Sequence, residues 1–161
     1  MKKSSEKQPS VVGLFSGCGG LDLGFKHAGF DILWANDFNA DSVKTYARNI
    51  GGHIVLGDIT KIPSKEIPSN FDVLLGFPCQ GFSVANTKRS MKDERNYLYL
   101  EMLRILKDKK PKFFVAENVK GLLSLEKGDV IKMILRDFEN IGYKVDYRLL
   151  MASDYGIPQH R

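Results

Sequence analysis

The chain has 161 residues, of which 43% are hydrophobic and 27% are charged, and its formal net charge is +5. This length suits one domain with a sizeable core, the composition is that of a soluble globular protein, and the basic balance permits a polyanionic partner. The sequence holds no apolar run near the roughly 20 residues that a membrane helix needs, so we expect no membrane association. Two cysteines, Cys18 and Cys79, lie in different loop-like motifs. Their placement argues against a disulfide framework and favours a reducing cytoplasm.

Short apolar runs alternate with amphipathic segments along the chain. The polar residues 1–10 are expected to form a flexible tail, and residues 11–161 one folded domain. Strands are predicted at residues 11–15, 30–35, 53–56, 72–76, 113–116 and 143–151. Helices are predicted at residues 21–28, 39–49, 96–106 and 129–141, and a basic loop at residues 84–95. This alternation predicts an α/β fold with a mostly parallel sheet and helices on both faces.

A glycine-rich turn, residues 16–20, separates the first strand from the first helix. Glycines there let a ligand approach the backbone, and a helix N-terminus favours a negative group. The dinucleotide fingerprint fails because Asp22 occupies its third glycine position. Asp37 follows the second strand, where it suits ribose hydroxyls, and Asp58 with Ile59 follows the third, where the pair suits an adenine edge. The pattern favours S-adenosylmethionine over NAD, although glycines that only form a turn remain an open alternative.

A single cysteine lies directly after a buried apolar run. Cys79 stands in the segment 76–83, beyond the predicted strand 72–76, at the sheet edge where open α/β proteins bind ligands. Glu117 follows the next predicted strand, so its carboxylate is expected beside Cys79. Alone, Glu117 is an ordinary surface acid; paired with Cys79, a catalytic role is the better interpretation.

Together these motifs resemble the DNA cytosine-5 methyltransferases over about residues 11–161. The segments that carry the resemblance are Phe15-Ser16-Gly17-Cys18-Gly19-Gly20, Asp37, Asp58-Ile59, Gly76-Phe77-Pro78-Cys79-Gln80-Gly81-Phe82-Ser83, Glu117-Asn118-Val119 and Gln159-His160-Arg161. They follow in the family's order and near its spacing. One departure is minor, because Asp37 stands where the family usually has Glu. The other is that the chain stops at Arg161, whereas the family continues with a target-recognition domain and a final helix.

The resemblance implies a fold and a set of site residues. The fold is a truncated, Rossmann-like S-adenosylmethionine-dependent methyltransferase sheet. The implied catalytic residues are Cys79, Glu117 and Arg161, and no metal is implied. The implied cofactor-binding residues are Phe15, Ser16, Gly17, Cys18, Gly19, Gly20, Asp37, Phe38, Asp58, Ile59, Pro78 and Leu98. The implied DNA-binding residues are Gln80, Ser83, Lys88, Arg89, Arg95 and Gln159.

The implied reaction is methylation of cytosine at C5 in double-stranded DNA. The Cys79 thiolate attacks C6 of a flipped cytosine, and Glu117 contacts N3 and the exocyclic amine. Arg161 helps to hold the base or the Cys79 loop. The basic loop 84–95 is expected to close over the DNA backbone, and a purely solvated charged loop is an equally open interpretation. Action in the bacterial cytoplasm, at the nucleoid and in a restriction-modification system, is expected.

Three other interpretations stay open. A Cys–His hydrolase would pair Cys79 with His160 or His53, but it leaves the glycine turn and the acidic strand ends unexplained. An RNA cytosine-5 methyltransferase would use the same scaffold. A cofactor-binding subunit, inactive alone, would need a second polypeptide that carries the target-recognition domain and the final helix.

Overall fold

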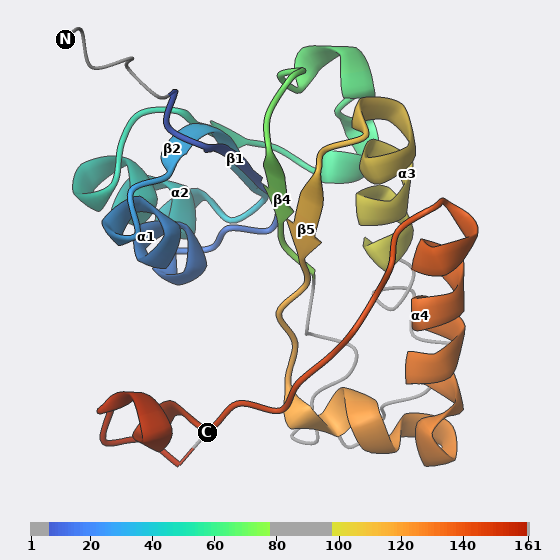
Figure 1. The fold of residues 1–161 in the computed structure, drawn as a ribbon. Helices are drawn as coiled ribbons and strands as arrows, with labels where there is room; N and C mark the ends of the chain where they lie inside the picture. The colour runs from blue at the N-terminus through green and yellow to red at the C-terminus, as the bar shows by residue number, and fades with distance from the viewer. Residues whose placement is uncertain (1–6, 78–97, 161) are drawn as a thin grey trace, which may run out of the picture.

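The computed structural model describes residues 7–77 and 98–160. Its centre is a five-stranded sheet in the order β3-β2-β1-β4-β5 (Figure 1). The strands are β1 (Ser10–Gly13), β2 (Asp31–Asp37), β3 (Ile54–Leu56), β4 (Val73–Leu75) and β5 (Phe113–Val115). Every neighbouring pair is parallel. The predicted parallel sheet is therefore confirmed, and its strand order reverses between β1 and β4.

Four α-helices of the described chain match the predicted ones within a few residues. They are α1 (Gly20–His27), α2 (Ala40–Asn49), α3 (Tyr99–Lys109) and α4 (Asp129–Asn140). Short 3-10 segments add η1 (Ile59–Lys61), η2 (Ser64–Glu66), η4 (Lys120–Gly128) and η5 (Ala152–Tyr155). Both Asn39 and Asp41 are candidate caps of α2 in the sequence, and the structure selects Asn39, whose side chain accepts from the backbone N–H groups of Asp41 (3.1 Å) and Ser42 (2.9 Å). The predicted start of the third helix, Asn96, lies outside the described residues.

Helices cover both faces of the sheet, with α1 and α2 on one side and α3 and α4 on the other (Figure 1). Alternate strand residues point to opposite faces, so the buried core divides accordingly. Val11 and Leu75 pack with side chains of α1, whereas Leu74 packs with Met102 and Ile105 of α3. This two-sided burial explains why the strands read as continuous apolar runs in the sequence.

The predicted sixth strand is wrong. Residues 143–151 form no strand, and after α4 the chain leaves the sheet and runs down to η5 (Figure 1). Tyr143 anchors the start of this segment: its ring packs edge-on against Phe114, and its hydroxyl donates to the carbonyl of Pro111 (2.8 Å). Beyond it, Tyr147 and Leu149 are more than half exposed. Apolar alternation suggested a strand, but a strand also needs a ladder partner, and none pairs with this segment in the described chain.

Candidate active site at the carboxyl edge of the sheet

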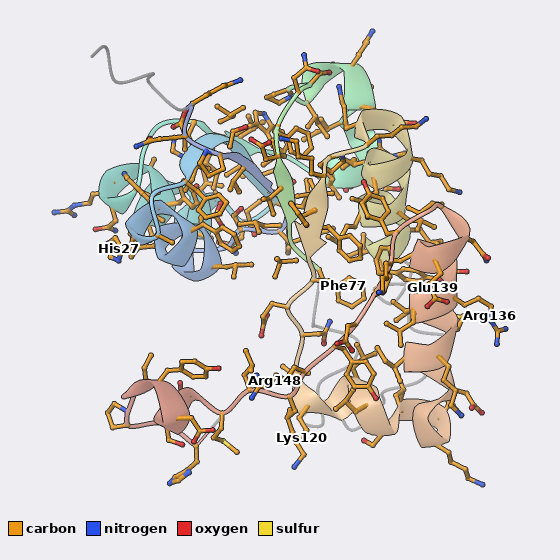
Figure 2. All side chains as sticks on the ribbon, viewed as in Figure 1. His27, Phe77, Lys120, Arg136, Glu139 and Arg148 are labelled. Carbon is orange, nitrogen blue, oxygen red and sulfur yellow. The ribbon has the colours of Figure 1, made fainter. Side chains whose placement is uncertain are left out.

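A pocket lies where β1, β4 and β5 end. Its lining residues are Leu14, Phe15, Ser16, Leu21, Asp22, Leu75, Gly76, Phe77 and Glu117. The fold thus brings the start of the glycine turn, the end of β4 and the predicted catalytic acid to one place. Figure 2 shows Phe77 at the ends of the central strands, and its ring centroid lies 6.2 Å from that of Tyr99. The next residue along the chain, Pro78, begins the segment that contains Cys79.

The backbone conformation of the turn requires glycine at two of its positions. Gly17 and Gly19 have positive φ values of 56° and 91°, which side chains rarely adopt. A Cβ on Gly19 would also lie 2.7 Å from the Tyr46 ring of α2. Gly19 caps α1 without any side-chain hydrogen bond, and a helix N-terminus of this kind favours an anionic ligand. The turn therefore does more than reverse the chain: it presents a helix N-terminus at the pocket.

Asp37 holds the same turn from β2. Its Oδ2 accepts from the backbone N–H of Gly17 (2.8 Å), and its Oδ1 accepts from the backbone N–H of Asn39 (2.8 Å). The side chain is only 8% exposed. A carboxylate offers about four acceptor sites, of which these two bonds occupy two. The bonds give Asp37 a structural role in holding the turn, which its position in the sequence did not reveal.

The other predicted cofactor-binding residues, among them the pair Asp58 and Ile59 expected at the adenine edge, are in different environments. Asp58 caps η1, and hydrogen bonds from the side chain and backbone of Thr60 (2.7 and 3.0 Å) lower the pKa of its carboxyl group. Phe38 is 63% exposed, and Leu98 is half-buried. Ile59, by contrast, lies in the main core and presents almost no surface to a ligand. Asp58 and Phe38 are therefore the accessible members of this group.

A buried polar network under the turn was missed in the sequence. Asp22, 1% exposed, accepts hydrogen bonds from the hydroxyls of Tyr46 (3.1 Å) and Ser16 (3.3 Å), and the Tyr46 hydroxyl lies 3.0 Å from His53 Nε2. Burial raises the pKa of Asp22, and burial together with the Asp22 charge raises that of Tyr46. Burial lowers the pKa of His53. Gly13 makes room for the carboxylate, since a Cβ there would collide with Asp22 Oδ1. The only signal of this network in the sequence was Asp22 itself, an acidic residue at the third glycine position of the dinucleotide fingerprint.

The remaining predicted site residues lie at the pocket or on the turn, beyond η5, or outside the described residues. Glu117 is exposed and lines the pocket, whereas Cys18 and Gly20 are exposed on the turn. Gln159 follows η5, which lies apart from the sheet in Figure 1, and Gln159 does not line the pocket. The predicted residues outside the described chain are Pro78, Cys79, Gln80, Ser83, Lys88, Arg89, Arg95 and Arg161.

Within residues 7–77 and 98–160, no three His, Cys, Asp or Glu side chains are grouped so as to hold a metal ion. Among the helices of those same ranges, none has the length and apolar character to cross a membrane.

The parallel sheet, the glycine turn and the acidic strand ends make up the fold of an S-adenosylmethionine-dependent methyltransferase. The crystal structure of the S. pombe Dnmt2 methyltransferase superposes with a TM-score of 0.71 and 26% identity, over 96% of this chain and 48% of that one. A family model described as C-5 cytosine-specific DNA methylase matches residues 10–161. The chain belongs to this family.

Curated relatives agree with that assignment. The chain is 47% identical over 160 residues to the Type II methyltransferase M.NgoFVII of Neisseria gonorrhoeae, covering 98% of this chain and 43% of the relative. It is 46% identical to the Type II methyltransferase M.FnuDI of Fusobacterium nucleatum, covering 94% of this chain and 44% of the relative. The chain thus spans less than half the length of these relatives.

Proposed function

We propose that the chain carries out methyl transfer from S-adenosylmethionine to C5 of cytosine in DNA, through a covalent adduct with Cys79. One observation supports the proposal: Glu117 lines one pocket together with Ser16, at the start of the glycine turn, and with Phe77, which stands two residues before Cys79 in the sequence. An acid beside a ligand-binding turn, with a cysteine following closely in the chain, suits acid-assisted covalent catalysis.

The residues present fit the cofactor. The open N-terminus of α1 suits the carboxylate of its amino-acid part, Asp37 has acceptor sites left for ribose, and the charged Asp58 suits an amino group on the base. Two carboxylates, Asp22 and Glu117, line the pocket and favour a cationic ligand there. When bound, the cofactor supplies an electrophilic methyl group on a sulfonium.

The protein groups make the cytosine ring reactive. The Cys79 thiolate forms a bond to C6, and the electron pair of the C5–C6 double bond becomes available at C5 while Glu117 supplies a proton at N3. After C5 has taken the methyl group, the C5 proton passes to solvent, its electron pair restores the C5–C6 double bond and expels Cys79 as a thiolate, and Glu117 takes back the proton from N3. The base must leave the helix stack for this chemistry, at a cost of about a few kcal/mol.

Several finer expectations belong to the same proposal. Residues 11–161 would form the cofactor-binding catalytic domain, with Arg161 and Pro78 at the active site. Gln80, Ser83, Lys88, Arg89, Arg95 and Gln159 would contact DNA. Action at the bacterial nucleoid and the need for a second polypeptide with a target-recognition domain stay predictions.

Asp37→Ala is expected to weaken S-adenosylmethionine binding by about 1–3 kcal/mol, the range for hydrogen bonds to a charged group. The loss has two sources, because the variant removes both the ribose acceptor and the support of the Gly17 backbone. Isothermal titration measures the affinity. Asp31→Ala, an exposed change at the opposite end of β2, is the matched control. An unchanged affinity in folded Asp37→Ala would rule out the ribose role.

A methyl-incorporation assay tests the proposed reaction. The chain is incubated with labelled S-adenosylmethionine and either mixed-sequence DNA or tRNA, both alone and fused to the part of M.NgoFVII that lies beyond the match. We expect label in DNA as 5-methylcytosine, at least in the fused form. Label confined to tRNA would replace DNA with RNA as the substrate. Label in neither, from a fusion that binds the cofactor, would contradict the proposal.

A further inference from the structure

In the described chain, the connection from β3 to β4 is made without an α-helix. Residues 57–72, all of which the structure describes, contain no α-helix and instead hold the two three-residue turns η1 and η2. Turns this short have weak internal hydrogen bonding and leave backbone carbonyls in need of donors. Asp58 stands directly before η1 as its N-cap. The position of Asp58 therefore depends on the contacts that hold η1 and η2 in place.

One guanidinium on α3 holds both turns. Arg104 Nη2 donates to the carbonyl oxygens of Ile59 (3.2 Å) and Ile62 (3.1 Å), and Nη1 donates to Ser64 Oγ (2.6 Å). Glu101, one helical turn earlier, orients the group by accepting from Nε (2.8 Å) and by pairing with Nη2 (2.7 Å). Arg104 thus reaches across more than 40 positions of sequence to the segment that follows Asp58.

The chemistry of this contact requires arginine. A planar guanidinium has five N–H donors in a fixed fork, whereas a lysine ammonium is a single point with three. The side chains of Arg104 and Glu101 are 31% and 20% exposed, so water competes only partly for these bonds. Beneath them, Ile59 is buried in the core that includes Met102 of α3. Apolar packing fixes the depth of η1, and Arg104 fixes its backbone orientation.

We propose that Arg104 is a positioning residue that sets nucleobase recognition by Asp58. The proposal rests on the proposed function, in which Asp58 accepts from the amino group of the cofactor base. Asp58 Oδ1 is already taken by Thr60, and Oδ2 lies 3.8 Å from the ammonium of Lys61. The carboxylate therefore has a defined orientation, which Arg104 maintains through η1. A base with an amino donor is accepted, and a base with a keto oxygen at that place leaves two acceptors facing each other.

The test compares two ligands that differ only at the 6-position and in the proton on N1 of the base: S-adenosylhomocysteine and S-inosylhomocysteine, titrated calorimetrically into the chain. We expect the original protein to prefer the adenine ligand by roughly tenfold or more, the scale of one hydrogen bond to a charged group. Arg104→Lys is expected to reduce this preference to about threefold or less, chiefly by weakening the adenine ligand. Arg136→Lys is the matched control, because Arg136 is exposed and points away from α4 in Figure 2.

The results distinguish a positioning role of Arg104 from a purely structural one. An unchanged preference in folded Arg104→Lys, or equal weakening of both ligands, would mean that Arg104 only stabilises the fold and would overturn the inference. If Arg104→Lys does not fold, Glu101→Gln loosens the same guanidinium without removing it, and the same loss of preference is expected. Binding of neither ligand by the original chain would refute the proposed cofactor itself, which distinguishes that failure from failure of the Arg104 role.

Discussion

Cys79→Ser is expected to lower methyl transfer by more than about a thousandfold, the scale seen when a covalent enzyme loses its nucleophile. A serine hydroxyl is far less ionised at neutral pH than a thiol and adds poorly to C6. Cofactor affinity should stay nearly unchanged, because the proposed cofactor site consists of the turn, Asp37 and Asp58. Label incorporation gives the rate, and calorimetric titration with S-adenosylmethionine gives the affinity.

Cys18→Ser is the matched control for that experiment. Cys18 is the other cysteine of the chain, and it is exposed on the glycine turn. Because Cys18 lies on the turn proposed to bind the cofactor, any effect of its replacement is expected on cofactor affinity, and methyl transfer at saturating S-adenosylmethionine should stay largely intact. If Cys79→Ser instead loses cofactor binding as fully as a variant of the glycine turn does, Cys79 supports the fold and is not the nucleophile.

Glu117→Gln is expected to reduce kcat by about 10²–10⁴-fold, the usual contribution of a general acid. The amide keeps the shape of the side chain and can still accept a hydrogen bond, but it cannot deliver a proton to the ring. Glu117 is exposed at the mouth of the pocket, so the change should not disturb folding. Single-turnover methylation on DNA, with cofactor in excess, isolates the chemical step.

An exposed glutamate elsewhere serves as the comparison. Glu139→Gln changes an exposed acid on α4 by the same atoms and should leave the rate unaltered. A Glu117→Gln rate close to that of the original chain would show that another group protonates the base. A loss that appears only in KM would assign Glu117 to binding of the base.

Local patterns were sufficient to predict most of the fold. Apolar runs bounded by glycine or polar residues identified the five strands, and Asn39 marked the start of α2. The expected strand at residues 143–151 failed because strand formation depends on a pairing partner, which a local pattern does not contain. Propensity and periodicity indicate which secondary structure a segment favours locally. Whether a strand forms also depends on a neighbouring strand with which it can pair.

The sequence predicted the candidate-site residues that stand at the end of a strand. It did not predict the long-range hydrogen bonds that support them. Asp37 ends β2 and Glu117 follows β5, so their place at the carboxyl edge of the sheet could be predicted from the sequence. The support of the turn by Asp22 and Tyr46, and the hold of Arg104 on η1, join residues 24 and 45 positions apart. Such hydrogen bonds have no sequence spacing of their own, because they arise from how helices pack on the sheet.

Covalent trapping tests the central claim most directly. Double-stranded DNA with 5-fluorocytosine at its cytosines is incubated with S-adenosylmethionine and the form of the chain that methylates ordinary DNA, then examined by denaturing mass spectrometry. Fluorine at C5 cannot leave as a proton does, so the adduct cannot break down. The account predicts a stable species with the mass of protein, DNA and one methyl group, attached at Cys79 and absent from Cys79→Ser. Methylation of ordinary DNA without any trapped species, or attachment at another residue, would contradict it.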